Sequence, residues 1–417
     1  MNKLESKIYN VLDNYPDIKK LVRDVYQWLC SFIPVKNKMP LSMIARPGYF
    51  FGFHDKCPWS PDDSKLLTHK LIDISSLQIE KYKKVGIGYF SGEHFTDYTH
   101  ITTTNAWNFQ QGSMLQWVGC SNLIAFNDYA GEKTCSYMID TDGNVMHKFE
   151  RPFVVFSHDG NWALSYSFER LRIGMPGYEY ACGLDLEEQA PIPKKDGLYL
   201  INTNSGNISR LFSIEDIVNY NYCSYFKDSY HFFSHCIFAP SNERFVFFHR
   251  WLQPNNYLST RMISCDLNGS NLFIFPTNGM VSHICWLDDE SIIAYANTVK
   301  HGRNYYRFTD RTGKFSIIGK DIFTCDGHPQ VSFDKIWLIT DTYADRFRRQ
   351  FLNLYDFAGN ILYNIAMLRI PAEFKNEVRC DFHPRWNRHS TMISFDSAHT
   401  GVRSHCTIEL PVNSHEI

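Results

Sequence analysis

The first 36 residues carry a different hydrophobic pattern from the remainder of the chain. Their apolar residues recur at steps of three and four, which is the spacing of one face of an α-helix. These positions are Leu4, Ile8, Val11, Leu12, Tyr15, Ile18, Leu21, Val22, Val25, Tyr26 and Leu29. The polar side is basic and carries Lys3, Lys7, Lys19, Lys20 and Arg23. We therefore predict an amphipathic helical leader over residues 1–36, broken near Pro16, that either packs on the main domain or docks on a partner or a membrane surface.

From residue 37 onward the pattern changes to short runs in which apolar and polar residues alternate, separated by turn residues. A degenerate repeat of two strands around a turn occurs seven times. Its aligned anchor residues are Trp59, Trp117, Phe156, Phe238, Trp286, Val331 and Trp386. The anchors recur about every 54 residues, which fits one four-stranded blade of a β-propeller.

Such blades also need outer strands and a closed ring. Segments such as SYMIDTDGNVMHKF and TRMISCDLNGSNLFIF have Asp, Asn or Gly turns between strand runs, which predicts the outer hairpins. A single strand at 404–410 follows the seventh copy, so we expect a strand near Leu41 to Arg46 to complete the last blade. The predicted fold is all-β: a seven-bladed β-propeller over residues 37–417, closed by an N-terminal strand and preceded by a short helical extension.

Composition narrows the classes of function. The chain is 44% hydrophobic and 16% aromatic, which favours a large core built from strands. Its net charge of -2 gives no overall attraction for nucleic acid. No stretch of about 18 apolar residues predicts a transmembrane segment, and the N-terminus lacks the apolar core of a secretory signal. The 12 cysteines form no CxxC pair, so we expect reduced thiols and a cytoplasmic location.

Histidine occupies one equivalent position in four consecutive repeats, three residues before the anchor. These residues are His235, His283, His328 and His383. The position begins the innermost strand of a blade, so the four imidazoles should converge at one mouth of the central channel. Converging neutral imidazoles suit a divalent ion such as zinc, manganese or iron. The same four side chains could instead grip an anionic sugar directly.

A long insertion separates the third and fourth repeats, where the gap between anchors widens to 82 residues. Long insertions in a propeller lie on its faces and often build the binding site. This one contributes Arg172, Tyr178 and Tyr180, and Gln111 precedes the second anchor on the same edge. We predict that these four side chains contact a polar ligand.

Several long strings resemble the propeller polysaccharide lyases of the oligogalacturonate-lyase and ulvan-lyase kind. They are FHDKCPWSPDD, WNFQQGSMLQW, MVSHICWLDDESIIAYA, DGHPQVSFDKIWLITDTY and RCDFHPRW followed by FDSAHTG. The likeness spans roughly residues 45 to 411. It implies β-elimination on a uronate-containing glycan, in which a base removes the proton at C5 and a cation neutralises the neighbouring carboxylate.

The resemblance also implies roles for individual residues. His235, His328 and His383, with His283 as a fourth, would hold a divalent metal, manganese or zinc. His54 or His249 would be the base, and the neutralising charge would come from the basic residues Arg250, Arg379 and Lys56. The sequence departs from the oligogalacturonate type at one ligand, because the only comparable glutamine is Gln330, two residues after His328.

Three functions remain open at this stage. The leading hypothesis is a cytoplasmic, metal-assisted lyase acting on short anionic oligosaccharides. The second is a non-catalytic propeller that binds glycans or proteins in surface-polysaccharide production, with residues 1–36 docking it on a partner or a membrane. The third is metal-dependent hydrolysis, because the same ion could activate water.

Overall fold

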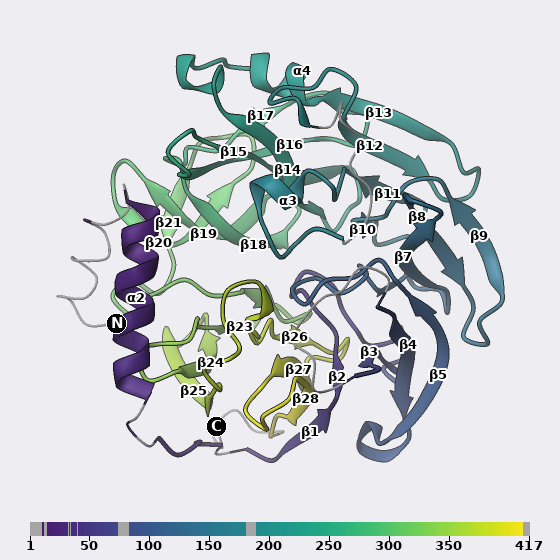
Figure 1. Ribbon diagram of the computed structural model, residues 1–417, viewed down its shortest axis with the longest axis vertical. Helices are drawn as coiled ribbons and strands as arrows, with labels where there is room; N and C mark the ends of the chain where they lie inside the picture. Colours follow the sequence, from purple (N-terminus) through teal and green to yellow (C-terminus); the bar gives the residue numbers. More distant parts are fainter. Residues whose placement is uncertain are drawn as a thin grey trace.

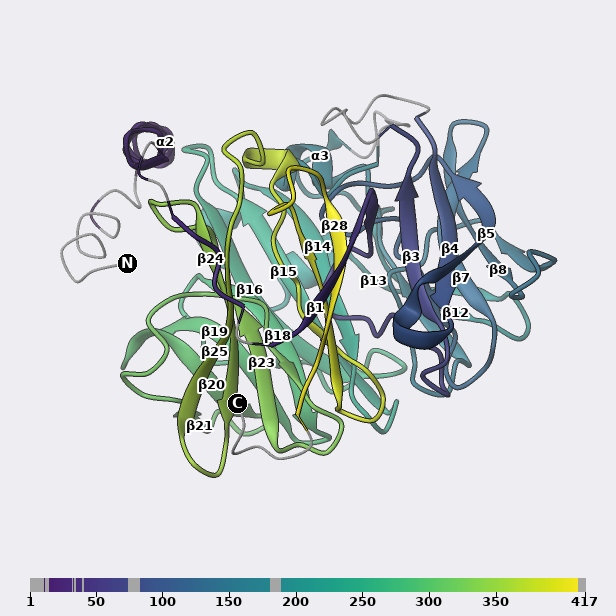
Figure 2. The ribbon, with the colours of Figure 1, turned by 90° about the horizontal axis from the view of Figure 1, so that it is seen from below.

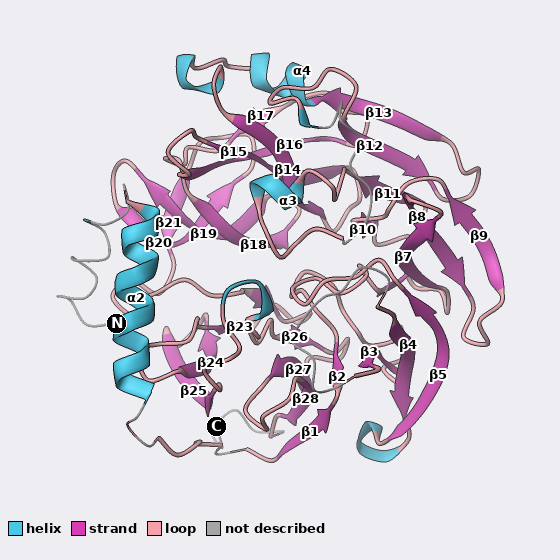
Figure 3. Ribbon diagram, viewed as in Figure 1, coloured by secondary structure: helices cyan, strands magenta, loops and turns pink. Residues whose placement is uncertain are grey.

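Seven four-stranded antiparallel sheets surround a central axis in the computed structural model, which confirms the predicted seven-bladed β-propeller (Figure 1). The structure describes residues 11, 15–31, 33, 35–39, 41–73, 83–180 and 189–411. Strands make up most of the molecule, and its helices are short apart from one helix of 16 residues (Figure 3).

Each blade runs from an innermost to an outermost strand. The first blade contains β2 (Tyr49–Phe50), β3 (Leu66–Leu71), β4 (Val85–Ser91) and β5 (Asp97–Thr104). The second contains β6 (Gln116–Trp117), β7 (Ile124–Ala130), β8 (Lys133–Ile139) and β9 (Val145–Phe149). The third contains β10 (Val155–Phe156), β11 (Trp162–Ser165), β12 (Gly197–Asn202) and β13 (Ile208–Ser213). The fourth contains β14 (Tyr230–Phe238), β15 (Arg244–Leu252), β16 (Leu258–Asp266) and β17 (Phe273–Ile274).

The last three blades repeat this plan. The fifth contains β18 (Val281–Asp288), β19 (Ser291–Thr298), β20 (Gly302–Thr309) and β21 (Phe315–Ile317). The sixth contains β22 (Gln330–Val331), β23 (Trp337–Asp341), β24 (Arg349–Asp356) and β25 (Ile361–Arg369). The seventh contains β26 (Arg385–Trp386), β27 (Met392–Ser397), β28 (Ser404–Glu409) and, as its outermost strand, β1 (Met43–Pro47).

The ring closes as the single strand after the seventh repeat predicted. β1 pairs antiparallel with β28, with Ala45 opposite Cys406. The first and last strands of the propeller therefore share one sheet, so the last blade is complete only when both strands are folded.

Apolar side chains fill the spaces between blades, and buried polar residues on second strands fix each blade to the next. Asp396 on β27 accepts hydrogen bonds from the backbone nitrogens of Phe51 and Gly52. Asn127 on β7 bonds both the nitrogen and the carbonyl oxygen of Phe153. Because these contacts tie the entries of innermost strands, the residues at the channel mouth are held on a rigid frame.

Helices lie in the insertions and before the propeller. α3 (Leu171–Gly174), α4 (Ile214–Asn219), η4 (Ser224–Phe226) and η5 (Asn376–Val378) lie between strands, and η2 (Glu93–Phe95) joins β4 to β5. The predicted leader is described mainly as α2 (Pro16–Ser31), which begins at the expected proline. Seen end-on, α2 stands at the rim on the same side of the ring as α3 (Figure 2). No helix in the described part of the chain is long and apolar enough to cross a membrane.

Candidate functional site

Five histidines converge on Phe53 at the centre of the ring. This histidine cluster consists of His54, His235, His283, His328 and His383. The Phe53 ring centroid lies between 4.6 and 6.1 Å from the centroids of all five imidazoles. None of the five is more than 4% exposed. The structure thus brings together the four histidines that the repeats align, and it adds His54.

Local backbone irregularities turn these imidazoles toward the axis. The β14 ladder shifts register between Ser234 and Ile237, and the β18 ladder shifts between Val281 and Ile284. His235 and His283 lie in these two bulges, which re-aim side chains at the price of ladder hydrogen bonds. His235 (φ 53°) and His383 (φ 46°) adopt the left-handed region, which L-residues rarely occupy. Met114 (φ 55°), at the equivalent position of the second blade, is left-handed as well, so this conformation belongs to the entry of the innermost strand and is not particular to histidine.

One buried carboxylate orients two members of the cluster. Asp341, at the end of β23, accepts hydrogen bonds from the His328 backbone nitrogen at 2.8 Å and from His328 Nδ1 at 2.7 Å. Its other oxygen accepts from the His383 backbone nitrogen at 3.0 Å. Because Nδ1 of His328 carries the donated proton, its Nε2 keeps a lone pair. This is the arrangement by which a carboxylate commonly orients a metal-binding histidine.

Three nitrogen atoms in the cluster are buried without a hydrogen-bond partner. They are Nε2 of His235, His328 and His383. Asp381 lies beside two of them, and the candidate ligand atoms of His328, Asp381 and His383 all lie within 4.8 Å of one another. Imidazole nitrogen and carboxylate oxygen are donors that manganese and zinc accept. The residues therefore fit a divalent ion, and Asp381 supplies the carboxylate ligand that spacing alone could not identify.

Burial keeps most of these imidazoles neutral. It lowers the pKa of His54, His235 and His383 well below the ordinary value, and the positive charge of neighbouring groups lowers each pKa further. His328 differs: burial lowers its pKa, but the carboxylates of Asp341, Asp381 and Asp326 together outweigh burial, and the net shift is upward. Neutral imidazoles have the lone pairs that a metal ligand needs.

Two arginines border the cluster. Arg379 donates from Nε to Asp381 at 2.6 Å and from Nη2 to the Tyr178 hydroxyl at 2.7 Å. The Arg250 guanidinium lies 5.2 Å from the Phe248 ring, on which His235 stacks. By contrast, the predicted neutralising group Lys56 donates to both carboxylate oxygens of Asp55 at 2.8 Å, so its charge is already balanced.

The most exposed aromatic residue beside the cluster is Tyr343, which the sequence reasoning missed. Its side chain is 38% exposed, and its ring centroid lies 5.5 Å from that of His328 and 6.2 Å from that of His283. Asp326, half-buried at the same mouth, accepts from His283 Nδ1 at 3.3 Å. Tyr343 follows Asp341 by two residues, and this closeness to a strand end was the only signal in the sequence.

Two residues singled out in the sequence make hydrogen bonds that serve the fold. His249 accepts from Arg261 Nε at Nδ1 and donates from Nε2 to His231, which donates in turn to the Phe226 carbonyl. Both nitrogens of His249 are therefore engaged, and no lone pair is left for a catalytic base. Gln330 donates to the His54 carbonyl and accepts from the Trp386 nitrogen, so it links blades.

The four predicted ligand-binding residues do not lie together at the channel mouth. Tyr178 lies at the mouth beside Arg379, whereas Tyr180 is a core residue, stacked on Phe168 at 4.4 Å. Arg172 is half-buried and donates to the Tyr180 carbonyl at 3.5 Å. Gln111 is buried, with its side-chain oxygen unpaired.

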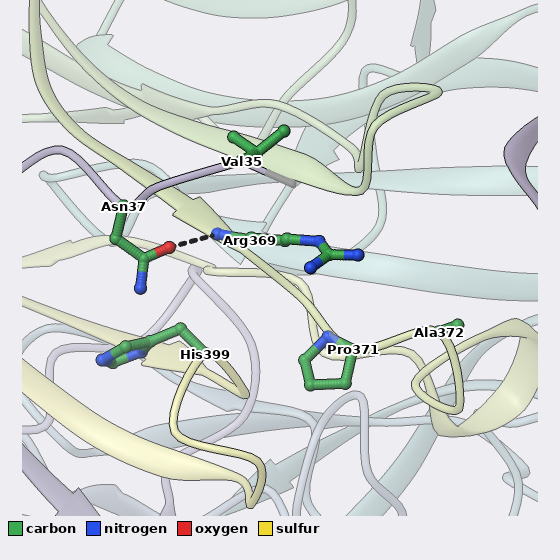
Figure 4. Close-up of a pocket in the computed structure, with 6 residues that line it drawn as sticks. All are labelled: Val35, Asn37, Arg369, Pro371, Ala372 and His399. Atoms are coloured by element: carbon green, nitrogen blue, oxygen red, sulfur yellow. Dashed lines mark hydrogen bonds between the residues drawn. The ribbon is translucent and has the colours of Figure 1, made fainter. Parts of the chain in front are cut away.

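A separate pocket of about 420 Å³ lies where residues 35–39 cross the sixth blade toward β1 (Figure 4). There Asn37 accepts a hydrogen bond from the Arg369 backbone nitrogen at 2.8 Å. The pocket is lined by Val35, Asn37, Arg369, Pro371, Ala372 and His399. It shares no residue with the histidine cluster.

The chain resembles known proteins in fold but not in sequence. No protein-family model matches the chain, and no curated protein matches it in sequence. An oligogalacturonate lyase solved in complex with manganese matches with a TM-score of 0.62 and 13% identity, over 90% of this chain and 98% of that one. The oligogalacturonate lyase from Vibrio parahaemolyticus matches with a TM-score of 0.61 and 12% identity, over 91% and 94%.

A third solved structure is more distant. The β-propeller domain of Cps50 from Myceliophteria thermophila matches with a TM-score of 0.50 and 10% identity, over 88% of this chain and 98% of that one. Identities this low establish architecture and not activity. The chain thus has the propeller fold of the oligogalacturonate lyases.

Proposed function

We propose that the protein is a metal-assisted lyase that cleaves uronate-containing oligosaccharides by β-elimination. The observation that carries the proposal is that His328 and His383, each with a buried Nε2 that has no hydrogen-bond partner, group with Asp381, which Arg379 contacts. Buried polar atoms without partners are costly, and a bound cation would satisfy them. The structural similarity to an oligogalacturonate lyase in complex with manganese supports the same choice.

In this proposal His328, His383 and Asp381 hold the ion, whereas His235, whose Nε2 is also buried without a partner, lies outside that group of ligand atoms. When bound, the ion supplies positive charge that stabilises a carboxylate whose neighbouring carbon is losing a proton. Arg379 is the protein's own cation for that carboxylate: its guanidinium donates to Asp381, Tyr178 and the Asn376 carbonyl, and its remaining N–H groups are left for the substrate.

We assign His283 as the base that removes the C5 proton. Its Nδ1 lies 3.0 Å from the Ser282 hydroxyl and 3.3 Å from Asp326, and when Nδ1–H donates to Asp326, Nε2 can accept a proton. The electrons of the broken C5–H bond form a C4=C5 double bond while the C4–O bond breaks. The leaving oxygen takes a proton, for which we assign the hydroxyl of Tyr343. Atoms and electrons balance without water or an oxidant.

The test uses saturated oligouronates of galacturonate, glucuronate and iduronate, incubated with the protein and Mn²⁺. Elimination creates a conjugated double bond, so ultraviolet absorbance should rise and should fail to rise with His283→Ala. His301→Ala is the matched control, because His301 lies on the exposed β19–β20 turn outside the cluster. Flat absorbance for the wild type on all three substrates, with metal bound, would exclude the lyase assignment.

The near-complete burial of the histidine cluster favours one second candidate. An ion enclosed at that depth could be structural, and the protein would then be a glycan-binding propeller without catalysis. Calorimetry distinguishes the two functions: heat of binding with oligouronates but no absorbance change would identify the binding protein.

A further inference from the structure

Arg250 is a buried cation for which the described part of the chain supplies no anionic partner. The residue is 6% exposed, its one hydrogen bond runs from Nη1 to the sulfur of Met175 at 3.4 Å, and its Nε is buried without a partner. A thioether sulfur is a weak acceptor. Every other buried arginine among the described residues donates to at least two oxygen atoms, as Arg46 and Arg348 do to backbone carbonyls. Because charged side chains are almost never fully buried unless they are paired, Arg250 points to an anion that binds from outside.

The aromatic neighbours of Arg250 do not balance its charge. The groups that most favour the charged guanidinium are the phenols of Tyr178, Tyr343 and Tyr166. Burial raises the pKa of all three phenols, so they are neutral near pH 7. Burial lowers the pKa of Arg250 to about 10, which still leaves the guanidinium charged at that pH.

The carboxylates near these groups are already engaged. Asp326, the next group that favours the charged guanidinium, accepts from His283 Nδ1 at 3.3 Å. Asp55, which adds to the effect of burial on the pKa of Tyr166, accepts from Lys56 Nζ with both oxygens at 2.8 Å. Neither carboxylate forms an ion pair with the guanidinium, so the positive charge is left uncompensated.

Two further donors without partners lie near Arg250. The His235 ring stacks on Phe248 with centroids 5.1 Å apart, and the Arg250 guanidinium lies 5.2 Å from the same Phe248 ring. His235 Nδ1 lies 2.9 Å from the Ser234 hydroxyl; when this hydroxyl donates to Nδ1, the buried, unpartnered Nε2 carries the proton and can donate. The Tyr166 hydroxyl is also buried without a partner. A guanidinium, an imidazole N–H and a phenol O–H together suit an oxyanion.

From these three unpartnered donors we propose that Arg250, His235 and Tyr166 form a second oxyanion subsite, which takes a carboxylate or sulfate group on the sugar next to the one that is cleaved. The inference rests on the proposed function, because it concerns the same oligosaccharide. It differs from the expectation that the family resemblance gave, in which Arg250 neutralises the carboxylate at the reacting carbon. Here Arg379 and the ion serve that carboxylate, and Arg250 serves a second acidic group.

The subsite and the metal ligands lie on opposite sides of the channel mouth. The three donors belong to the third and fourth blades, whereas the metal ligands precede the innermost strands of the sixth and seventh, across the axis (Figure 1). The Phe53 centroid is 5.0 Å from that of His235 and 4.9 Å from that of His383, so this ring contacts both groups. His235 lies outside the group of metal ligands. A ligand that reaches both groups therefore needs acidic groups on two neighbouring sugars.

The test compares disaccharides that share the reacting uronate. One has a carboxylate on both sugars, and the other has a neutral second sugar. Calorimetry measures their binding to the full chain with Mn²⁺ in a His283→Ala background, which lacks the proposed base and so does not consume the ligand. The diacid should bind about tenfold or more tightly, and Arg250→Met should remove this difference. A third disaccharide, with a sulfate ester on the second sugar, distinguishes a carboxylate subsite from a sulfate subsite.

Two variants control for a merely structural role of Arg250. Arg250→Lys keeps the charge and should recover part of the preference for the diacid. Arg261→Met is the matched control, because Arg261 is 7% exposed, lies on the next strand of the same blade and donates to His249 and to the Asn221 and Ile217 carbonyls. It should lower the free energy of unfolding and keep the preference. Mn²⁺ affinity should stay the same in all three variants.

The possible results separate this subsite from the lyase assignment. Equal affinity for the diacid and the neutral disaccharide overturns the subsite, and so does equal weakening of both by Arg250→Met. A preference for the diacid that depends on Arg250, with no rise in ultraviolet absorbance in the wild type, refutes elimination and supports the subsite. Absence of binding by all three disaccharides refutes both.

Discussion

Replacing Asp341 by asparagine should weaken metal binding without removing any candidate ligand. Asp341 Oδ1 accepts from both the nitrogen and Nδ1 of His328, and Oδ2 accepts from the His383 nitrogen. Asparagine keeps one acceptor oxygen, but its amide would direct a donor at the His383 N–H. His328 would then lose its charged partner, and His383 would lose the bond that sets its backbone.

The size of the effect follows from these three hydrogen bonds. Loss of a carboxylate that orients a metal-binding histidine typically lowers metal affinity about 10- to 100-fold, or about 1.4 to 2.8 kcal/mol. One unsatisfied buried N–H costs about 1 to 3 kcal/mol of folding free energy. Asp341→Asn should therefore remain folded while its Mn²⁺ or Zn²⁺ dissociation constant rises by at least about tenfold.

Calorimetric titration of the metal, with elemental analysis of the purified protein, measures this change. The control is Asn127→Ser, which alters the equivalent tie between the second and third blades and contacts no member of the histidine cluster. It should lower the free energy of unfolding and leave metal affinity unchanged. If Asp341→Asn behaves in the same way, the carboxylate only ties blades, and the proposed orientation of His328 is wrong.

Three further outcomes are expected. Arg379→Lys should lower kcat/KM on oligouronates about 10- to 100-fold with little change in stability, because a lysine cannot bridge Asp381 and Tyr178 through a planar fork; unchanged kcat/KM would argue against a role for Arg379 at the carboxylate. Burial lowers the pKa of His231 to about 4, so in the unfolded chain this residue binds its proton between pH 4 and 6.5. About 3 kcal/mol of stability from His231, full above pH 6.5, should be lost as the pH falls to 4. Urea unfolding of the wild type and of His231→Gln should therefore differ in pH dependence, and identical dependence would contradict the reasoning. Deletion of residues 1–36 should preserve cooperative unfolding. Deletion of residues 1–47 also removes β1, the partner of β28, and should abolish cooperative unfolding. Circular dichroism melts of both variants would show whether closure of the last blade is needed.

The architecture follows from the repeats in the amino-acid sequence. Strand pairing within a blade is local, so each repeat leaves its own alternating pattern, and an anchor such as Trp59 or Trp386 recurs at the blade period. Seven repeats predict seven blades. Because the last repeat has one strand too few, they also predict that an N-terminal strand completes it, as β1 does by pairing with β28. Equivalent positions in a ring meet at its axis, so the alignment of four histidines in the repeats predicts that they lie close together.

Which of these side chains can share one ligand depends on contacts between residues far apart in the sequence. His249 and His328 were both predicted site residues, yet His249 is bonded by Arg261 and His231, whereas His328 is oriented by Asp341 and its Nε2 has no partner. Bulges and left-handed residues rotate side chains without leaving a pattern in the repeat. The amphipathic period of α2 likewise predicted a stripe but not the side that faces solvent. That choice depends on Gln27 meeting Ala344, 317 residues away, and no local pattern encodes so distant a contact.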